Sequence, residues 1–95
     1  MAETTLEHWA RVEVAKAGGL MLKWVSPGTT GIPDDLIFWP CRRVDIVEYK
    51  FEDEGDLSPR QMIVRDQLNV LGWAVIVLRT RAAVLEYIDS NRPIA

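Results

Sequence analysis

Two apolar runs joined by a very short connection restrict the fold of this chain more than any other feature. "DDLIFW" covers residues 34–39 and "RVDIVEYKF" covers residues 43–51, with only Pro40-Cys41-Arg42 between them. Short runs rich in Val, Ile and aromatic residues are typical of strands, and so tight a connection favours an antiparallel hairpin. The sequence therefore predicts a hairpin whose turn is centred on Cys41.

This register brings acidic side chains together. With the turn at Cys41, residue 38 lies opposite 44, residue 36 opposite 46, and Asp34 directly opposite Glu48. Lys50 shares their face, because alternate residues of a strand point to the same side. Opposed carboxylates repel each other, so such a pair either shares a proton or binds a hard cation through its oxygens. Two carboxylates beside a lysine suit metal-assisted phosphodiester hydrolysis.

A structural interpretation of the same residues also stands. Asp34 could cap the turn that follows Pro33, and Glu48 and Lys50 could lie on a solvated strand face. Apolar residues surround them in the strand, however: Val44, Ile46, Val47 and Phe51. Because charged groups in apolar surroundings are costly unless neutralised, this context favours a functional site.

The remaining segments predict a mixed sheet flanked by helices. Residues 5–17 have the apolar spacing of one helical face and are followed by Gly18-Gly19, a common helix end. "LMLKWV" reads as a strand, and "SPGTTGIP" and "EDEGD" read as loops. Ser58 and Pro59 begin a second helix with Val64, Leu68 and Leu71 on one face. "WAVIVLR" predicts a strand buried on both faces, and residues 80–91 a closing helix, giving the order α-β-β-β-α-β-α.

Length and composition indicate one small domain. The chain has 95 residues, is 48% hydrophobic and carries a net charge of −3, which counts against a DNA binder that relies on bulk electrostatics. This net charge does not exclude an enzyme that binds phosphate through a metal. A single cysteine and the absence of a membrane-length apolar run or a signal peptide predict a cytoplasmic protein. At this size, dimerisation commonly adds stability.

Three further polar residues are candidates for the site. Glu7 lies at the edge of the apolar stripe of the first helix, and Glu13 lies nearer its middle. Gln61 continues the apolar face of the second helix one turn earlier. Glu7 and Gln61 each have a structural alternative, since Thr4-x-x-Glu7 and Ser58-x-x-Gln61 both fit a capping box.

Lys23 and Arg60 are candidate phosphate contacts, because both fall near the proposed site. Ordinary solvated charge is the alternative for each. The four tryptophans are predicted to be core or interface residues, with Trp39 the least certain. His8 and Cys41 are not expected to act in catalysis. An apolar patch of Met62, Ile63 and Val70 suggests either a subunit interface or packing against the last helix.

The motifs "GGLMLKWVSPGTTGIPD", "VEYK", "LSPRQ" and "LGWAVIVLR" occur in this order. Together they closely resemble the stand-alone VRR-NUC (virus-type replication-repair nuclease) domains of phages and bacteria, within the PD-(D/E)xK nuclease superfamily. The resemblance runs from about Glu7 to Tyr87. It implies a restriction-endonuclease-like α/β core, with residues 1–95 forming a single nuclease domain.

The resemblance also assigns roles to residues. Asp34, Glu48 and Lys50 map onto the catalytic Asp, Glu and Lys, and Gln61 onto the family's glutamine. Glu7, rather than Glu13, maps onto the acidic residue of the first helix, because its distance to Gly18-Gly19 fits. The expected metal ligands are the carboxylates at 7, 34 and 48 together with the backbone carbonyl of Tyr49. The family implies Mg²⁺ or Mn²⁺ dependence, cleavage of branched DNA such as Holliday junctions, and a homodimer.

Two features depart from the family pattern. The segment after Lys50 is acidic ("FEDEGD") where relatives are often basic or glycine-rich. Asp35 stands where a non-acidic residue is more usual, although strand alternation points it away from Asp34. The sequence therefore predicts a metal-dependent endodeoxyribonuclease. Its alternatives are a non-catalytic DNA- or protein-interaction module on the same fold, or a nuclease active only with a partner protein.

Overall fold

The computed structural model describes residues 2–50 and 55–91. Its elements follow the predicted order and are α1 (Ala2–Lys16), β1 (Leu20–Lys23), β2 (Asp35–Trp39), β3 (Arg43–Tyr49), α2 (Pro59–Val70), β4 (Val75–Leu78) and α3 (Arg81–Asn91). Across these ranges, no helix has both the length and the apolar character that crossing a bilayer requires.

The four strands form one mixed sheet in the order β1-β2-β3-β4. The first three strands are antiparallel, and β4 runs parallel to β3. In the hairpin, Leu36 pairs with Ile46 and Phe38 with Val44, which confirms the register predicted from the turn. Cys41 and Arg42 at its tip both adopt φ 65°, a left-handed conformation that non-glycine residues seldom take.

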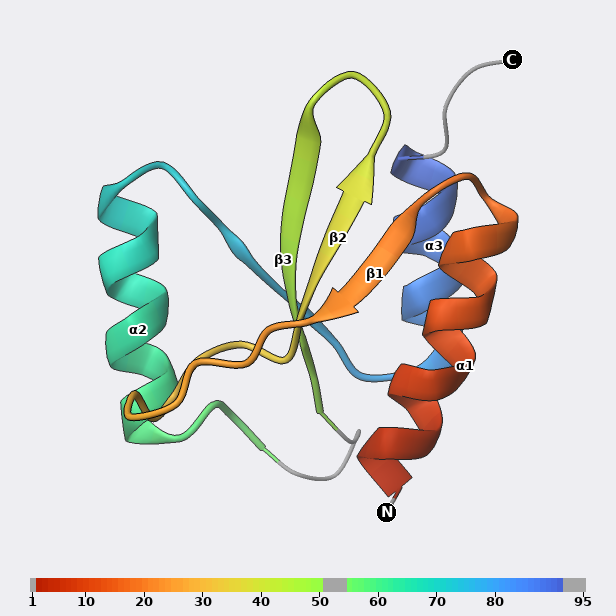
Figure 1. Cartoon of the computed structure of the whole chain (residues 1–95). Helices are drawn as coiled ribbons and strands as arrows, with labels where there is room; N and C mark the ends of the chain where they lie inside the picture. The colour runs from red at the N-terminus through yellow and green to blue at the C-terminus, as the bar shows by residue number, and fades with distance from the viewer. Residues whose placement is uncertain (1, 51–54, 92–95) are drawn as a thin grey trace.

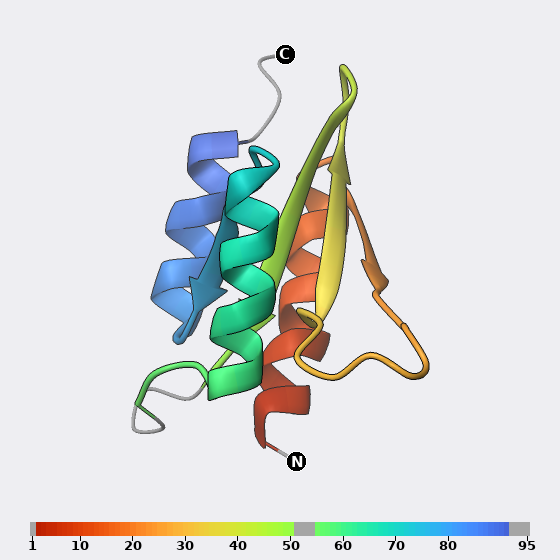
Figure 2. The same ribbon diagram turned by 90° about the vertical axis from the view of Figure 1, so that its left-hand side faces the viewer.

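Helices cover both faces of the sheet. In Figures 1 and 2, α1 and α3 lie on one face and α2 lies on the other. The main core lies between the sheet and the α1–α3 layer; its most buried members are Ala10, Val14, Ile37, Val47, Tyr49, Val84 and Ile88. The apolar patch on α2 therefore does not pack against the last helix: Ile63 and Val70 are exposed.

Local sequence explains where α1 ends. Gly18 takes a φ of 95°, and the N–H of Gly19 donates to the Val14 carbonyl at 3.0 Å, closing the last turn. A Cβ at position 19 would lie only 2.9 Å from the Trp39 ring. Close packing thus requires glycine at position 19, and the left-handed backbone favours glycine at position 18. Trp39 itself is buried in the core, although its position at the hairpin end made it the least certain of the tryptophans.

The structure corrects two predicted burial patterns on the α2 side. Leu71 is 74% exposed, because α2 has already ended and residue 71 is its C-cap. The strand at 75–78 is half-buried over most of its length and is not enclosed on both faces. It forms an edge of the sheet, and α2 contributes a single buried side chain, Val64, to its cover.

A close approach of backbones fixes the loop that precedes β2 to the start of α2. Gly31 has φ 83°, and a Cβ there would lie 2.6 Å from the Arg60 carbonyl oxygen. The Arg60 Nε also donates to the Thr30 hydroxyl at 3.0 Å. Only glycine fits this position, and the contact sets the beginning of β2 relative to the first turn of α2.

Candidate active site

The predicted site residues come from segments far apart in the sequence and meet where β2 begins and β3 ends. Asp34 immediately precedes β2, Glu48 is near the end of β3, and Gln61 is in the first turn of α2. Figure 1 shows these three segment ends on the same side of the molecule. The hairpin register places Asp34, Glu48 and Lys50 on the sheet face that α2 covers, as the alternation predicted.

Glu48 is the buried carboxylate of this face. It is 4% exposed, and its Oε2 accepts a hydrogen bond from the Gln61 side-chain amide at 2.7 Å. Its Oε1 is buried and has no hydrogen-bond partner within the described part of the chain. Burial, together with the negative charge of Asp34, raises the pKa of Glu48 to about 7, against the opposing effect of Lys50.

Gln61 forms the capping box that the sequence allowed and also contacts Glu48. The Ser58 hydroxyl accepts from the Gln61 backbone N–H, and the Gln61 Oε1 accepts from the Ser58 backbone N–H, which completes a capping box. The amide nitrogen of the same side chain then remains available to donate to Glu48. The cap therefore holds Gln61 in the orientation that supports Glu48.

Asp34 is held by the end of β3. Its Oδ2 accepts a hydrogen bond from the Tyr49 backbone N–H at 2.8 Å. Burial raises the pKa of Asp34, with a smaller contribution from Glu7, while the Tyr49 N–H and the charges of Lys23 and Lys50 oppose the rise. The Tyr49 backbone N–H thus borders the carboxylate pair, and the role of its carbonyl as a metal ligand stays a prediction.

Asp35 points to the opposite face of the sheet. Its side chain is completely buried, its Oδ1 accepts from Arg11 at 3.2 Å, and its Oδ2 has no partner in the described residues. Burial and the neighbouring Glu7 carboxylate raise the pKa of Asp35 to about 8. Sequence reasoning missed Arg11, although its position one helical turn after Glu7 was a signal that it could reach the same region.

Glu7 lies beside Asp35, on the α1 face of the sheet. It is buried, and its Oε2 contacts the Lys23 ammonium at 2.9 Å and the Arg11 guanidinium at 3.9 Å. Burial alone would raise the pKa of Glu7. The hydrogen bond with Asp35 and the cations Lys23 and Arg11 outweigh that effect and lower it. Glu13, the rival on this helix, pairs instead with Lys16 at 3.2 Å.

Comparison with known proteins identifies the chain. No protein-family model matches it. It is 40% identical over 76 residues to the "Putative nuclease p44" of Acyrthosiphon pisum secondary endosymbiont phage 1, covering 80% of this chain and 81% of the phage protein. A solved structure described as a VRR_NUC domain superposes with a TM-score of 0.83 at 25% identity, over 92% of this chain and 94% of that one. This chain belongs to the VRR-NUC family.

The acidic residues of this VRR-NUC domain fit a divalent cation only in part. Asp34 and the unpartnered oxygen of Glu48 offer the hard oxygen ligands that Mg²⁺ and Mn²⁺ prefer. Among residues 2–50 and 55–91, however, no three His, Cys, Asp or Glu side chains are arranged to hold a metal ion. Glu7, the third expected ligand, is engaged by Lys23.

Four other residues weighed from the sequence lie on separate segments of the fold. Arg60 is exposed at the start of α2, and Lys23 closes β1. His8 and Cys41 are both exposed, the first on α1 and the second at the hairpin tip. Residues 51–54 of the acidic segment after Lys50 lie outside the described residues; Asp56, the last residue of that segment, is exposed.

Proposed function

We propose that this VRR-NUC domain is a divalent-metal-dependent endonuclease that hydrolyses phosphodiester bonds in structured or branched DNA of the Holliday-junction type. The observation that carries the proposal is the buried Glu48 oxygen, which has no hydrogen-bond partner among the described residues and lies next to a second carboxylate that raises the pKa of Glu48. Such a group is costly in a folded protein unless a cation neutralises it.

The metal would be held by Asp34 and Glu48, with the backbone carbonyl of Tyr49 and the carboxylate of Glu7 as further ligands. A bound Mg²⁺ or Mn²⁺ would polarise the scissile phosphate and lower the pKa of a water molecule. Gln61 holds one Glu48 oxygen at 2.7 Å, which leaves the other oxygen to face the cation.

Lys50 would orient or deprotonate the attacking water. It follows Glu48 by two residues on the same strand face, and its backbone N–H continues the ladder to β4 through the Leu78 carbonyl at 3.1 Å. A residue so anchored brings a positive charge beside the carboxylate pair. Arg60 and Lys23, on either side of the pair, would contact DNA phosphates.

A homodimer is part of the proposal. On the sheet face opposite α1, Leu20 and Leu22 of β1 and Phe38 of β2 are exposed, and we call these three residues the open sheet face. It adjoins an apolar hollow of about 230 Å³ lined by Trp24, Leu36, Val44, Ile46, Leu68 and Trp73. Contiguous exposed apolar surface of this kind is typical of a protein interface. Two copies would supply two sites for symmetric cutting of a four-way junction.

The decisive experiment incubates the purified protein and Mn²⁺ with labelled four-way junction, splayed-arm, flap and plain duplex DNA. We expect cleavage of a branched substrate, and loss of that cleavage in Lys50→Ala with fold and oligomeric state retained. Lys16→Ala is the matched control, because Lys16 pairs with Glu13 away from the site. Cleavage by Lys50→Ala at the wild-type rate would remove the role of Lys50.

Failure to cleave any substrate has a separate meaning. If a folded protein binds Mn²⁺ but cuts none of the four DNAs, a nuclease that requires a partner protein becomes the better description. If it binds DNA without binding Mn²⁺, the domain is a non-catalytic interaction module. Thermal stabilisation by Mn²⁺ separates these cases, because a ligand that binds only the folded state raises the melting temperature.

A further inference from the structure

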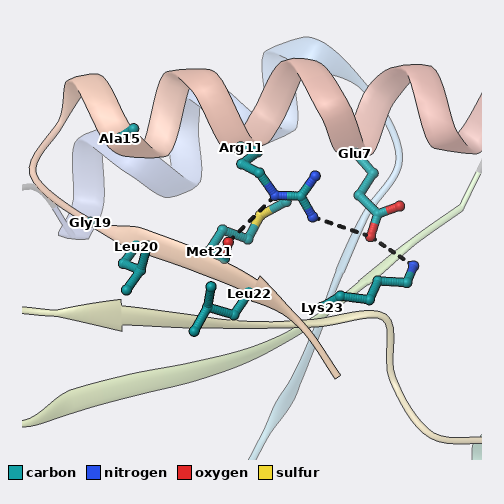
Figure 3. Close-up of a pocket in the computed structure, with 8 residues that line it drawn as sticks. All are labelled: Glu7, Arg11, Ala15, Gly19, Leu20, Met21, Leu22 and Lys23. Carbon is teal, nitrogen blue, oxygen red and sulfur yellow. Dashed lines mark hydrogen bonds and ion pairs between the residues drawn. The ribbon is translucent and has the colours of Figure 1, made fainter. Parts of the chain in front are cut away.

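Trp24 lies beside Asp34, one of the two carboxylates of the candidate site. Its backbone N–H donates to the Asp34 carbonyl at 3.0 Å, which continues the β1–β2 ladder by one residue. Figure 3 shows Lys23 reaching towards α1 while Leu22 points away from that helix. Because alternate residues of a strand share a face, Trp24 lies on the face that carries the carboxylate pair, where its ring lines the apolar hollow.

Two tryptophans border this apolar hollow. The hollow has a volume of about 230 Å³ and is lined by strand residues together with Leu68 of α2. Trp24 is half-buried, and Trp73, which follows α2, is 45% exposed. Neither ring belongs to the main core. Accessible aromatic rings beside a nucleic-acid site are typical stacking platforms for bases.

The hollow adjoins the carboxylate pair along both central strands. Its lining residue Leu36 lies two residues beyond Asp34. On the neighbouring strand, its lining residue Ile46 lies two residues before Glu48. Two residues of a strand span about 7 Å. A nucleotide whose phosphate lies at the carboxylates can therefore place its own base in the hollow.

The size and chemistry of the hollow favour a single nucleobase. Sites for drug-sized ligands have volumes of roughly 300–1,000 Å³, so a hollow of about 230 Å³ suits one ring system rather than a length of peptide. The net charge of −3 gives the chain little general attraction for phosphate, so base stacking is the better source of DNA affinity. An unpaired base costs the least to take out of a DNA stack.

We propose that the apolar hollow binds one unpaired base of the DNA substrate, stacked on Trp24 and with Trp73 as the second aromatic wall. This inference rests on the proposed function and names the feature of branched DNA that the domain recognises. The open sheet face stays available to a second copy, because none of its three residues lines the hollow.

DNA binding without cleavage tests the inference. The probes are a labelled duplex with one extra unpaired thymine, the same duplex with an abasic nucleotide at that position, and the fully paired duplex, all in Ca²⁺ at low salt. By fluorescence anisotropy, we expect the thymine bulge to bind roughly tenfold more tightly than the abasic bulge, the scale of one base–aromatic stack. Both bulges carry the same phosphates, so the difference reports the base. Equal affinity for the two bulges would overturn the inference.

Substitutions assign this preference to the tryptophans. Trp24→Leu keeps an apolar side chain without a stacking ring, so it should lose the preference for the thymine bulge while binding the paired duplex as the wild type does. Trp24→Phe, which restores a ring, should recover most of the preference. Trp9→Leu is the matched control, because Trp9 is also half-buried but contacts Arg81 in the α1–α3 layer. Retention of the preference by Trp24→Leu would contradict the assignment.

Trp73→Leu is a second variant at a more exposed position, and it should also weaken the preference for the thymine bulge. Light scattering on both leucine variants then separates a base from a second copy of the chain. Loss of a wild-type dimer in either variant would mean that the second copy covers the hollow, which overturns the inference and leaves the proposed function standing. A wild type that binds none of the three probes would overturn the proposed function together with this inference.

Discussion

At the scale of single residues, the carboxyl group of Glu48 is one of two buried carboxyl groups that are costly to ionise in this fold. It is almost fully buried, carries an oxygen with no partner among the described residues, and is repelled by Asp34. Asp35 adds a second buried carboxyl whose pKa is raised to about 8. Both groups hold a proton in the folded state at pH values where the unfolded chain has released it.

The free energy of unfolding of the metal-free protein should therefore fall as the pH rises from about 5 to about 8. The sign follows from the raised pKa values, because the folded state binds more protons than the unfolded state in this window. For Glu48, the change from 4.5 to about 7 corresponds to on the order of 3 kcal/mol. Urea denaturation in the presence of a chelator, at pH about 5 and at pH about 8, measures this change in unfolding free energy.

Glu48→Gln provides the control for this pH dependence. It keeps the shape of the side chain but cannot ionise, so its stability should fall less steeply with pH. The part of the pH dependence that is due to Asp35 should remain, since that carboxyl lies on the other face of the sheet. A wild-type protein whose stability is constant or increases across the window would contradict the raised pKa values.

The hairpin register predicted much of the site at this scale. Asp34, Glu48 and Lys50 could be placed on one face from the turn length and strand alternation alone. The contacts of Arg11 and Asp35 could not, because they depend on how α1 lies across the sheet, and no local pattern specifies that angle. Gln61 shows why a capping contact and a site contact can coexist. Its amide oxygen accepts from the Ser58 backbone, and its amide nitrogen donates to Glu48.

At the scale of elements, the loop before β2 and the first turn of α2 form a single structural unit. Gly31 makes their close approach possible, since a Cβ would lie 2.6 Å from the Arg60 carbonyl. Asp34 follows this loop and Gln61 lies in this turn, so the contact sets the distance between the strand side of the site and the helix side.

Gly31→Ala should lower both stability and cleavage. The left-handed backbone costs a side chain about 1–2 kcal/mol, and the clash with the Arg60 backbone adds to that. Gly28→Ala is the matched control, because Gly28 has nearly the same φ, 84°, but open space around it. Denaturant unfolding should show a larger loss of unfolding free energy for Gly31→Ala than for Gly28→Ala. Equal losses would mean that the loop can move away from α2 at little cost.

The elements on the α2 side were also the least well predicted. An apolar run such as "WAVIVLR" indicates a strand, but burial on both faces depends on what covers it. Here α2 covers its face only partly, so the strand is half-buried. Helix α1, by contrast, has a stripe whose residues Leu6, Ala10 and Val14 are all buried, as the pattern predicted.

At the scale of the whole molecule, the three layers are unequally filled. The α1–α3 side contains the main core, whereas the other side leaves the open sheet face uncovered. The order of elements and the mixed sheet followed from the sequence. The extent of this exposed surface did not, because it depends on where α2 sits over the sheet.

Leu22→Glu should convert the proposed homodimer to a monomer, since it places a charge on the open sheet face. Leu85→Glu is matched to it, because the two leucines are 47% and 44% exposed and Leu85 lies on α3 in the other layer. Size-exclusion chromatography with light scattering should give a dimer for Leu85→Glu and the wild type. A monomeric wild type would remove the dimer from the proposal.

The weak attachment of α2 to the sheet limits how long the site stays assembled. With one buried side chain, this helix can detach from the sheet at far lower free energy than the α1–α3 core can open. Gln61 would leave with it, and Glu48 would lose the hydrogen bond from the Gln61 amide. The assembled site therefore persists for a shorter time than the fold does. When α2 detaches, the domain stays folded but lacks the contact between Gln61 and Glu48.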